Sequence, residues 1–273
     1  MNAPQRGPEG LPSSLADGLA AGSLMDSNFR SVGTELAAAV EGGPELVVQP
    51  FLGADFIPHL DGQFSDVAAR LHSRWKLGVK RAIDIVGSLL LLILFAPVLL
   101  IASLAIISTS PGHVLFVQER LGRDGRPFRM FKFRSMYRDA EARRAELADL
   151  NECTGPIFKV RNDPRITPVG RVLRKLSLDE MPQLLNVLRG DMSLVGPRPP
   201  LPDEYAVYGP RERGRLAVKP GLTCTWQVSG RSDLDFDTWM EMDLSYIRDW
   251  SLWLDVKLLL LTIPAVLSGR GAY

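Results

Sequence analysis

Cysteine and histidine are scarce in this chain of 273 residues, which holds two cysteines and three histidines. Cys153 and Cys224 are too few for a disulfide framework, and we interpret them as free thiols in a reducing compartment. The histidines, His59, His72 and His113, are scattered without the spacing of a zinc site. These absences exclude a disulfide-stapled secreted protein and argue against a transition-metal centre. A magnesium ion bound by carboxylates stays open.

The N-terminal region lacks both a signal-peptide pattern and a regular hydrophobic period. Residues 1–69 are rich in glycine and proline, and we interpret them as a flexible acidic tail with a short helix near residues 35–40. The formal net charge of +1 hides an asymmetry, because acids outnumber bases in this tail whereas bases dominate residues 70–175. A basic body of this kind favours an anionic partner, a membrane surface or phosphates, and nucleic acid is not expected.

Long apolar runs are limited to one clear case, residues 85–107, which contain no charged side chain. About 23 residues in a straight helix extend ~34 Å, enough to cross a hydrocarbon core of about 30 Å. Pro97, preceded by the small Ala96, lies near the middle and favours a break or a kink.

The charges around this apolar segment bear on its topology. Both flanks are rich in lysine and arginine, and a spanning helix would place one basic cluster on the wrong side of the membrane. A helix that enters, breaks at Ala96 and Pro97, and returns keeps both clusters on the cytoplasmic face. We therefore favour a re-entrant hairpin, in which Asp84 stays close to water, over a spanning helix.

Residues 112–136 alternate apolar and polar side chains on either side of a glycine-containing turn, which predicts a β-hairpin. Gly125 in that turn suits a positive φ. A charged helix is predicted over residues 137–150, and a short basic helix around residues 171–175.

The C-terminal stretch, residues 255–269, is apolar but too short to span a membrane comfortably. It predicts a helix broken at Pro264 that either lies at a membrane interface or is buried in the core. The predicted fold class is therefore mainly α with a small β-hairpin.

Two adjacent acids, Asp179 and Glu180, interrupt the stretch "LSLDEMPQLLNVLRGDMSLVGPRPP". A capping box from Ser177 to Glu180 explains them as helix-capping groups, but it leaves Pro182 inside the hydrogen-bond ladder. A cap at Asp179 moves Pro182 into the first turn, where its missing N–H costs little. Capping therefore accounts for one of the two acids, but not easily for both.

The alternative for the acid pair is chemistry on phosphate. An aspartate beside arginines can attack phosphorus as a nucleophile, while a neighbouring glutamate and a magnesium ion hold a diphosphate. Basic residues cluster just before the pair, and they suit a diphosphate and lipid headgroups equally well; they are Arg161, Arg165, Arg171, Arg174 and Lys175.

Five motifs follow the apolar segment in a fixed order: "RLGRDGRPF", "KFRSM", "LSLDEMPQLLNVLRGDMSLVGPRP", "KPGLTCTWQVSGRS" and "DLSYIRDWSLWLDVKLL". Together they resemble the bacterial sugar transferase family, the monotopic polyprenol-phosphate phosphoglycosyl transferases. The resemblance extends from about residue 76 to the C-terminus. It implies an enzyme on the cytoplasmic face of the bacterial inner membrane.

The resemblance implies roles for individual residues. Asp179 would be the nucleophile that carries a covalent phosphosugar, and Glu180 would assist through proton handling, with Asp179 and Glu180 as ligands of Mg²⁺. Contacts to substrate phosphates are expected from four basic residues, which are Lys132, Arg174, Arg198 and Arg231. Ala96 and Pro97 would form the break of the re-entrant helix.

The implied reaction moves a hexose 1-phosphate, of galactose or glucose, from a UDP-hexose to undecaprenyl phosphate and releases UMP, which initiates exopolysaccharide or capsule assembly. The expected organisation is a tail of residues 1–69, a membrane hairpin of residues 70–110 and a catalytic domain of residues 111–273. Residues 1–69 are too polar for a block of spanning helices, so the chain resembles the short form of the family. Membrane lipids are expected partners, and a homodimer stays open.

Two other functions compete with this one. A silent membrane-interface scaffold could recruit polysaccharide-assembly partners through the basic face and the apolar segment. A one-step glycosyl transferase would pass on the sugar without its phosphate and release UDP. The chain also departs from the family pattern with Ala96, Lys219 and Cys224, where serine, arginine and glycine are usual. Cys224 puts the local turn geometry in doubt, because glycine there can serve a positive φ.

Overall fold

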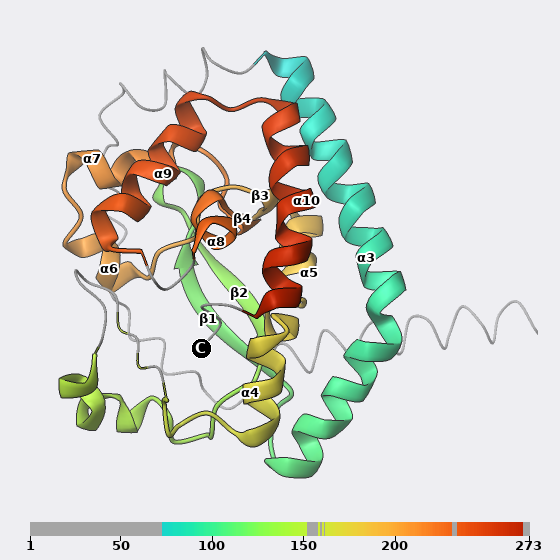
Figure 1. The fold of residues 1–273 in the computed structure, drawn as a ribbon, viewed down its shortest axis with the longest axis vertical. Helices are drawn as coiled ribbons and strands as arrows, with labels where there is room; N and C mark the ends of the chain where they lie inside the picture. Colours follow the sequence, from blue (N-terminus) through green and yellow to red (C-terminus); the bar gives the residue numbers. More distant parts are fainter. Residues whose placement is uncertain (1–72, 152–157, 159, 161, 231–233, 270–273) are drawn as a thin grey trace, which may run out of the picture. The chain divides into compact units, whose positions relative to one another are not determined.

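The computed structural model describes residues 73–151, 158, 160, 162–230 and 234–269. Within these ranges the chain is mostly helical with two small sheets, which confirms the predicted fold class (Figure 1). The predicted tail of residues 1–69 lies outside the described residues. The elements are α3 (Arg74–Thr109), β1 (Leu115–Leu121), η1 (Arg123–Gly125), β2 (Pro127–Phe133), η2 (Ala142–Leu150), α4 (Pro168–Lys175), η3 (Leu178–Glu180), α5 (Gln183–Arg189), β3 (Ser193–Val195), α6 (Pro202–Ala206), α7 (Pro210–Arg213), η4 (Gly214–Ala217), β4 (Gly221–Thr223), α8 (Thr225–Ser229), α9 (Phe236–Arg248) and α10 (Leu252–Ser268).

The apolar segment lies within α3, a single helix of 36 residues that continues through Pro97. Figure 1 shows that its axis bends midway along its length. The helix thus continues through the predicted break at Ala96 and Pro97, because proline removes only one backbone donor and the neighbouring turns keep theirs. Within the described ranges, α3 is the one helix long and apolar enough to cross a membrane.

One face of α3 packs against the rest of the described chain, and the opposite face is exposed. Ala102 and Ile106 are buried together with Phe133 and Leu173, whereas Leu94 is 71% exposed. The helix therefore presents a long apolar surface outward while its inner face anchors it to the strands and to α4.

Asp84 on the inner face of α3 is buried, which makes its predicted closeness to water wrong. Its carboxylate accepts hydrogen bonds from the Ser193 hydroxyl and the Leu194 N–H, both at 2.9 Å. The first half of α3 lies directly against β3, so these two protein donors take the place of water around the carboxylate.

Two basic residues upstream of the apolar segment, Lys80 and Arg81, bind other parts of the protein. Lys80 contacts Asp255 of α10 at 2.6 Å and donates to the Val195 carbonyl at 2.9 Å. Arg81 donates to the carbonyls of Val187 and Leu188 at the end of α5, where cations are favoured. These contacts fasten α3 to α5, β3 and α10.

The predicted β-hairpin is confirmed. β1 and β2 pair antiparallel from Leu115 opposite Phe133 to Leu121 opposite Pro127. Gly125 has a φ of 72° in the turn, as predicted, and Asp124 also has a positive φ of 59°. β3 and β4 form a second, parallel pair.

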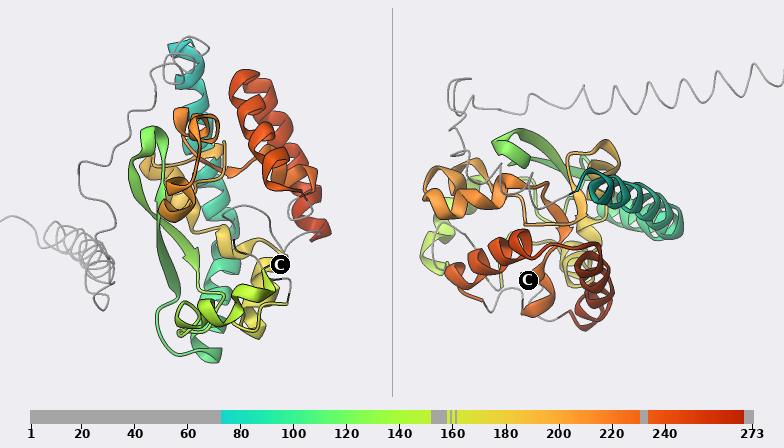
Figure 2. Two further views of the ribbon diagram at one scale, coloured as in Figure 1. Left: turned by 90° about the vertical axis from the view of Figure 1, so that its left-hand side faces the viewer. Right: turned by 90° about the horizontal axis from the view of Figure 1, so that it is seen from above.

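The remaining helices confirm some predictions and correct others. α4 forms where the basic helix was predicted, but residues 142–150 form the 3-10 helix η2 instead of an α-helix. α10 runs through Pro264 without the predicted break. Leu258 on α10 is buried while Trp253 is 72% exposed, so this helix is core on one face and surface on the other. In the view from above in Figure 2, α3 and α10 lie at the same side of the described body.

Candidate active site

The acid pair lies in η3, a single 3-10 turn between α4 and α5. Ser177, just before it, is left-handed with a φ of 54° and makes no capping hydrogen bond through its side chain. Pro182 occupies the capping position of α5, also without a side-chain cap. Both capping explanations of the acid pair are therefore wrong, because the left-handed turn at Ser177 starts η3 and α5 begins beyond Pro182.

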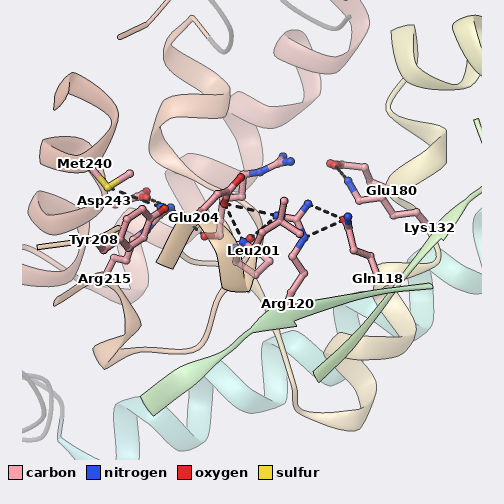
Figure 3. A network of polar contacts seen from close by, with 12 residues as sticks. Gln118, Arg120, Lys132, Glu180, Leu201, Glu204, Tyr208, Arg215, Met240 and Asp243 are labelled. Carbon is pink, nitrogen blue, oxygen red and sulfur yellow. Dashed lines mark hydrogen bonds and ion pairs between the residues drawn. The ribbon is translucent and has the colours of Figure 1, made fainter. Parts of the chain in front are cut away.

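Glu180 forms an ion pair with Lys132 of β2, with 2.9 Å between Oε1 and Nζ (Figure 3). Both side chains are mostly buried, at 16% exposed for Lys132 and 20% for Glu180. Burial lowers the pKa of Lys132, and the neighbouring Glu180 carboxylate opposes that shift. The pair thus holds a cation and a carboxylate close together in a poorly solvated place.

Asp179 is 8% exposed, and its pKa lies above the usual aspartate range. Burial is the main cause, followed by repulsion from Glu180, whereas Lys132 and Arg174 act in the opposite direction. A carboxylate that is poorly solvated and more basic than usual is a stronger nucleophile once it is ionised.

Arg174 reaches this region from α4, and its Nε donates to the Ser135 hydroxyl at 3.0 Å. Burial lowers the pKa of Arg174, while Asp179 is the first of the carboxylates that raise it. α4 packs directly against the backbone at Ser135. A Cβ added at Gly170 would come within 1.9 Å of the Ser135 carbonyl oxygen, which shows how close the two segments are. The close approach of α4 to Ser135 therefore fixes where Arg174 lies.

A shallow pocket that is partly open to solvent lies next to the ion pair. Its walls combine three cations and one carboxylate with neutral polar and apolar groups; the lining residues are Arg120, Met130, Lys132, Glu180, Gln183, Arg198, Pro199, Gly221, Leu222 and Gln227. The three cations are suited to an anionic ligand that carries more than one negative charge.

Arg120 was not predicted as a site residue. Its guanidinium donates to Gln118 at 2.7 Å and to the Pro199 carbonyl at 3.1 Å (Figure 3). Burial, and next the nearby Arg198, lower its pKa to about 10. The signal for Arg120 was present in the hairpin register, since its strand position lies on the same face as Lys132.

The structure gathers most of the predicted site residues. Lys132, Glu180 and Arg198 line one pocket, and Asp179 and Arg174 are close enough to interact electrostatically with this group. Two other predicted cations, Arg161 and Arg231, lie outside the described residues.

Arg165 does not join this group, because Asp163 holds it. Its Nε and NH2 groups contact the Asp163 carboxylate at 2.9 Å and 2.6 Å, and both side chains are buried. Arg171 and Lys175 are exposed on α4. The basic cluster of the sequence therefore divides into a structural arginine, a site arginine and two surface cations.

The fit of a magnesium ion depends on phosphate oxygens. Among the residues that the structure describes, there is no group of three or more aspartate, glutamate, histidine or cysteine side chains that could hold a metal ion. Asp179 and Glu180 offer two carboxylates, and Glu180 already contacts Lys132. Because Mg²⁺ commonly takes one or two carboxylates together with waters and substrate phosphates, the pair fits this ion when a phosphorylated ligand is bound.

A second ion pair, between Arg215 and Asp243, supports the turn that carries Arg198. Both side chains are 1% exposed. Arg215 also donates to the Tyr208 hydroxyl at 3.0 Å and to the Arg198 carbonyl at 2.9 Å (Figure 3). Sequence reasoning missed this pair, because its two members are 28 residues apart and belong to no local pattern.

Cys224 has an extended backbone with a φ of −151°. The position therefore needs no positive φ, and the doubt about this turn is removed. The thiol is free and buried, and burial raises its pKa well above the usual value. Such a thiol is unreactive at neutral pH.

Comparison with known proteins places these features in a family context. The family model described as "Bacterial sugar transferase" matches residues 75–269. Galactosyl transferase CpsE of Streptococcus agalactiae is 48% identical over 71% of this chain and 43% of its own length. Undecaprenyl-phosphate galactose phosphotransferase of Salmonella typhimurium is 44% identical over 71% of this chain and 42% of its own length.

A shorter relative is matched over more of its length. UDP-glucose:undecaprenyl-phosphate glucose-1-phosphate transferase of Caulobacter vibrioides is 45% identical over 71% of this chain and 72% of its own length. The chain thus spans less than half of the two longer relatives and most of this one.

Proposed function

The chain belongs to the bacterial sugar transferase family, and we propose that it transfers a hexose 1-phosphate, of glucose or galactose, from a UDP-sugar to undecaprenyl phosphate. The names of the Salmonella and Caulobacter relatives support this reaction class. The observation that carries it is Asp179, a buried carboxylate beside Lys132, Glu180 and Arg174 at a cationic pocket.

The first step is a substitution at the phosphorus that bears the sugar. An oxygen of the Asp179 carboxylate attacks this phosphorus, the bond to the bridging oxygen breaks, and UMP leaves with the electron pair. The product is an acyl-phosphate between Asp179 and the sugar. Lys132, Arg120 and Arg198 hold the negative charge that collects on the phosphates, and they act strongly because the site is poorly solvated.

The second step regenerates the enzyme. A phosphate oxygen of undecaprenyl phosphate attacks the same phosphorus, the acyl-phosphate bond breaks, and the Asp179 carboxylate is restored. Arg174 lies on the Asp179 side of the site and opposes the charge of that carboxylate as it leaves. Glu180 assists in proton handling and holds Lys132 in place.

A magnesium ion belongs to the same proposal. Asp179 and Glu180 are the residues that would hold it, and it would supply positive charge for the diphosphate of the donor. Lys132 and Arg198 keep their own contacts to the phosphates in this arrangement.

The proposed location is the cytoplasmic face of the bacterial inner membrane, with α3 embedded as a re-entrant helix bent at Pro97. The exposed apolar face of α3, the bend and the basic residues near both ends support this topology. α10 would lie at the interface with its exposed Trp253 in the headgroup region. Assembly of an exopolysaccharide would follow, in keeping with the name of the Rhizobium meliloti relative, exopolysaccharide production protein ExoY.

The test is the identity of the nucleotide released by purified protein in nanodiscs with undecaprenyl phosphate, magnesium and a panel of UDP-sugars. We expect UMP with UDP-glucose or UDP-galactose. Without the acceptor, we expect a sugar phosphate bound covalently to the protein. Release of UDP would assign a one-step glycosyl transferase instead, and no release from folded protein would favour a silent scaffold.

Topology has a separate test in intact cells. Single cysteines introduced near Ser65 and near Leu147 are expected to resist a membrane-impermeant thiol reagent added from outside. Labelling of either cysteine from outside would contradict the re-entrant topology.

A further inference from the structure

Gln183 is a buried amide that the mechanism above does not use. It is 3% exposed and lines the pocket together with Lys132 and Glu180. In the structure as described, its side chain has no hydrogen-bond partner in the protein. Its amide atoms are not among the fully enclosed polar atoms, so they reach accessible space, and the pocket supplies that space.

Asn186, a second buried amide on α5, behaves in the opposite way. Its Oδ1 accepts from the Phe131 N–H at 3.0 Å, and its Nδ2 donates to the Arg129 carbonyl at 2.7 Å. Asn186 is fully buried and fastens α5 to β2. The contrast matters because a buried polar group without a partner costs free energy unless something else satisfies it.

The chemistry of the pocket limits which ligand groups can hydrogen-bond the Gln183 amide. Phosphate oxygens only accept hydrogen bonds, and the pocket already offers them Arg120, Lys132 and Arg198. A carboxamide both donates and accepts, which matches a hydroxyl group that does the same. A UDP-hexose carries hydroxyls on its hexose and on its ribose, and the hexose is the one joined to the phosphorus that Asp179 would attack.

We propose that Gln183 is a specificity-determining residue whose amide hydrogen-bonds a hydroxyl of the donor's hexose. This inference rests on the proposed function for the identity of the donor. Gln183 is four residues from Asp179; it lines the pocket with Lys132 and Glu180, and both of these also interact electrostatically with Asp179. A sugar whose phosphorus is at Asp179 would therefore begin next to the pocket that this amide lines.

The first test separates a ligand contact from a structural role. Gln183→Met keeps the length of the side chain and removes its polar atoms. We expect the melting temperature of the free protein to stay the same or to rise, because an unpaired amide is removed from a buried place. Asn186→Leu is the matched control, and it should lower the melting temperature because it removes bonds to β2.

The second test measures binding of UDP-glucose and UDP-galactose by calorimetry and by thermal shift, in the wild type and in Gln183→Met. In Gln183→Met we expect the dissociation constant of the preferred donor to be about tenfold higher, which is the effect of losing one hydrogen bond to a matched group. Donors that lack one hydroxyl at a time locate the contact. The wild type and the variant should bind one such donor equally well and the others unequally.

Three results would overturn the inference. A fall in melting temperature comparable to that of Asn186→Leu would make Gln183 structural. Unchanged donor binding would mean that water alone satisfies the amide, and an equal loss with every deoxy donor would place the contact away from the sugar. Because binding is read without turnover, absent UMP release with normal binding would count against the proposed reaction and leave the role of Gln183 standing.

Discussion

Two ion pairs lie in the polar network of Figure 3, one between Lys132 and Glu180 and the other between Arg215 and Asp243. Each joins a cation and a carboxylate that are distant in the sequence. They differ in access, since the first pair keeps 16% and 20% of its side-chain surface and the second keeps 1% and 1%.

This difference in solvent access indicates different roles, ligand binding for the first pair and stabilisation of the fold for the second. The accessible pair borders the pocket, so a ligand can compete for its charges. The sealed pair is buried away from any ligand, and Arg215 also donates to the Tyr208 hydroxyl and the Arg198 carbonyl. We therefore expect changes around the accessible pair to alter activity with little effect on folding, and changes in the sealed pair to do the reverse.

The largest expected effect is on activity, from Asp179→Asn beside the accessible pair. The amide cannot form an acyl-phosphate, so UMP release should fall by about a thousandfold or more. The melting temperature should not fall, because a poorly solvated carboxylate is replaced by a neutral group. Substantial turnover in this variant would remove Asp179 from the role of nucleophile.

The sealed pair should produce the largest effect on stability. Asp243→Ala leaves Arg215 buried without its counter-ion, and we expect a loss of about 3–5 kcal/mol in the free energy of unfolding. Replacing both partners, with Arg215→Met and Asp243→Leu, should recover much of that loss. Chemical denaturation of the wild type and the two variants in one detergent measures the effect. Equal stability of wild type and Asp243→Ala would contradict a stabilising role for the buried pair.

Lys132→Met tests the accessible pair directly. We expect turnover to fall by about a hundredfold, because a preorganised cation is removed from the phosphates, while the melting temperature changes little. Lys132 also lowers the pKa of Asp179, so its loss should move the acid limb of the rate profile to higher pH.

The pH profile of the wild type provides the reference for that shift. Asp179 must be ionised to attack, and its pKa is raised by burial, so the rate should begin to fall with acid above the pH range of an ordinary aspartate. Rates of UMP release measured between pH 4 and pH 9 would give the acid limb of the wild type and of Lys132→Met. An acid limb that does not move in Lys132→Met would contradict the coupling between Lys132 and Asp179.

The smallest effect is expected from Ser135→Ala, which removes the hydroxyl that accepts from Arg174. The arginine keeps its charge but loses one positioning contact, so turnover should fall only a few-fold. A loss as large as that of Lys132→Met would mean that Ser135 does more than position Arg174.

Local patterns predicted the parts of the fold that depend on neighbours in sequence. Alternation and a glycine turn predicted β1 and β2, and apolar length predicted α3. Five of the candidate site residues, Asp179, Glu180, Lys132, Arg174 and Arg198, came from motifs and are brought together by the structure. Their roles in catalysis stay predictions.

Contacts between distant segments were beyond the reach of these patterns. Asp84 looked like a residue at a membrane entry, but it is satisfied by Ser193 and Leu194, which lie more than 100 positions away. Lys80 belongs to the basic flank that the topology argument used, yet its ammonium contacts Asp255 within the protein. Capping failed at Ser177 because a left-handed φ is a property of the assembled turn, which residue type alone does not reveal.

The close approach at Gly170 has a consequence for variation. A methyl group there would meet the Ser135 carbonyl at 1.9 Å, so even alanine would push α4 away and carry Arg174 with it. In a saturation library selected for polysaccharide production, this position should retain glycine alone. The exposed neighbour Val172 on the same helix should accept most replacements. Tolerance in such a library would thus outline where α4 touches the catalytic core.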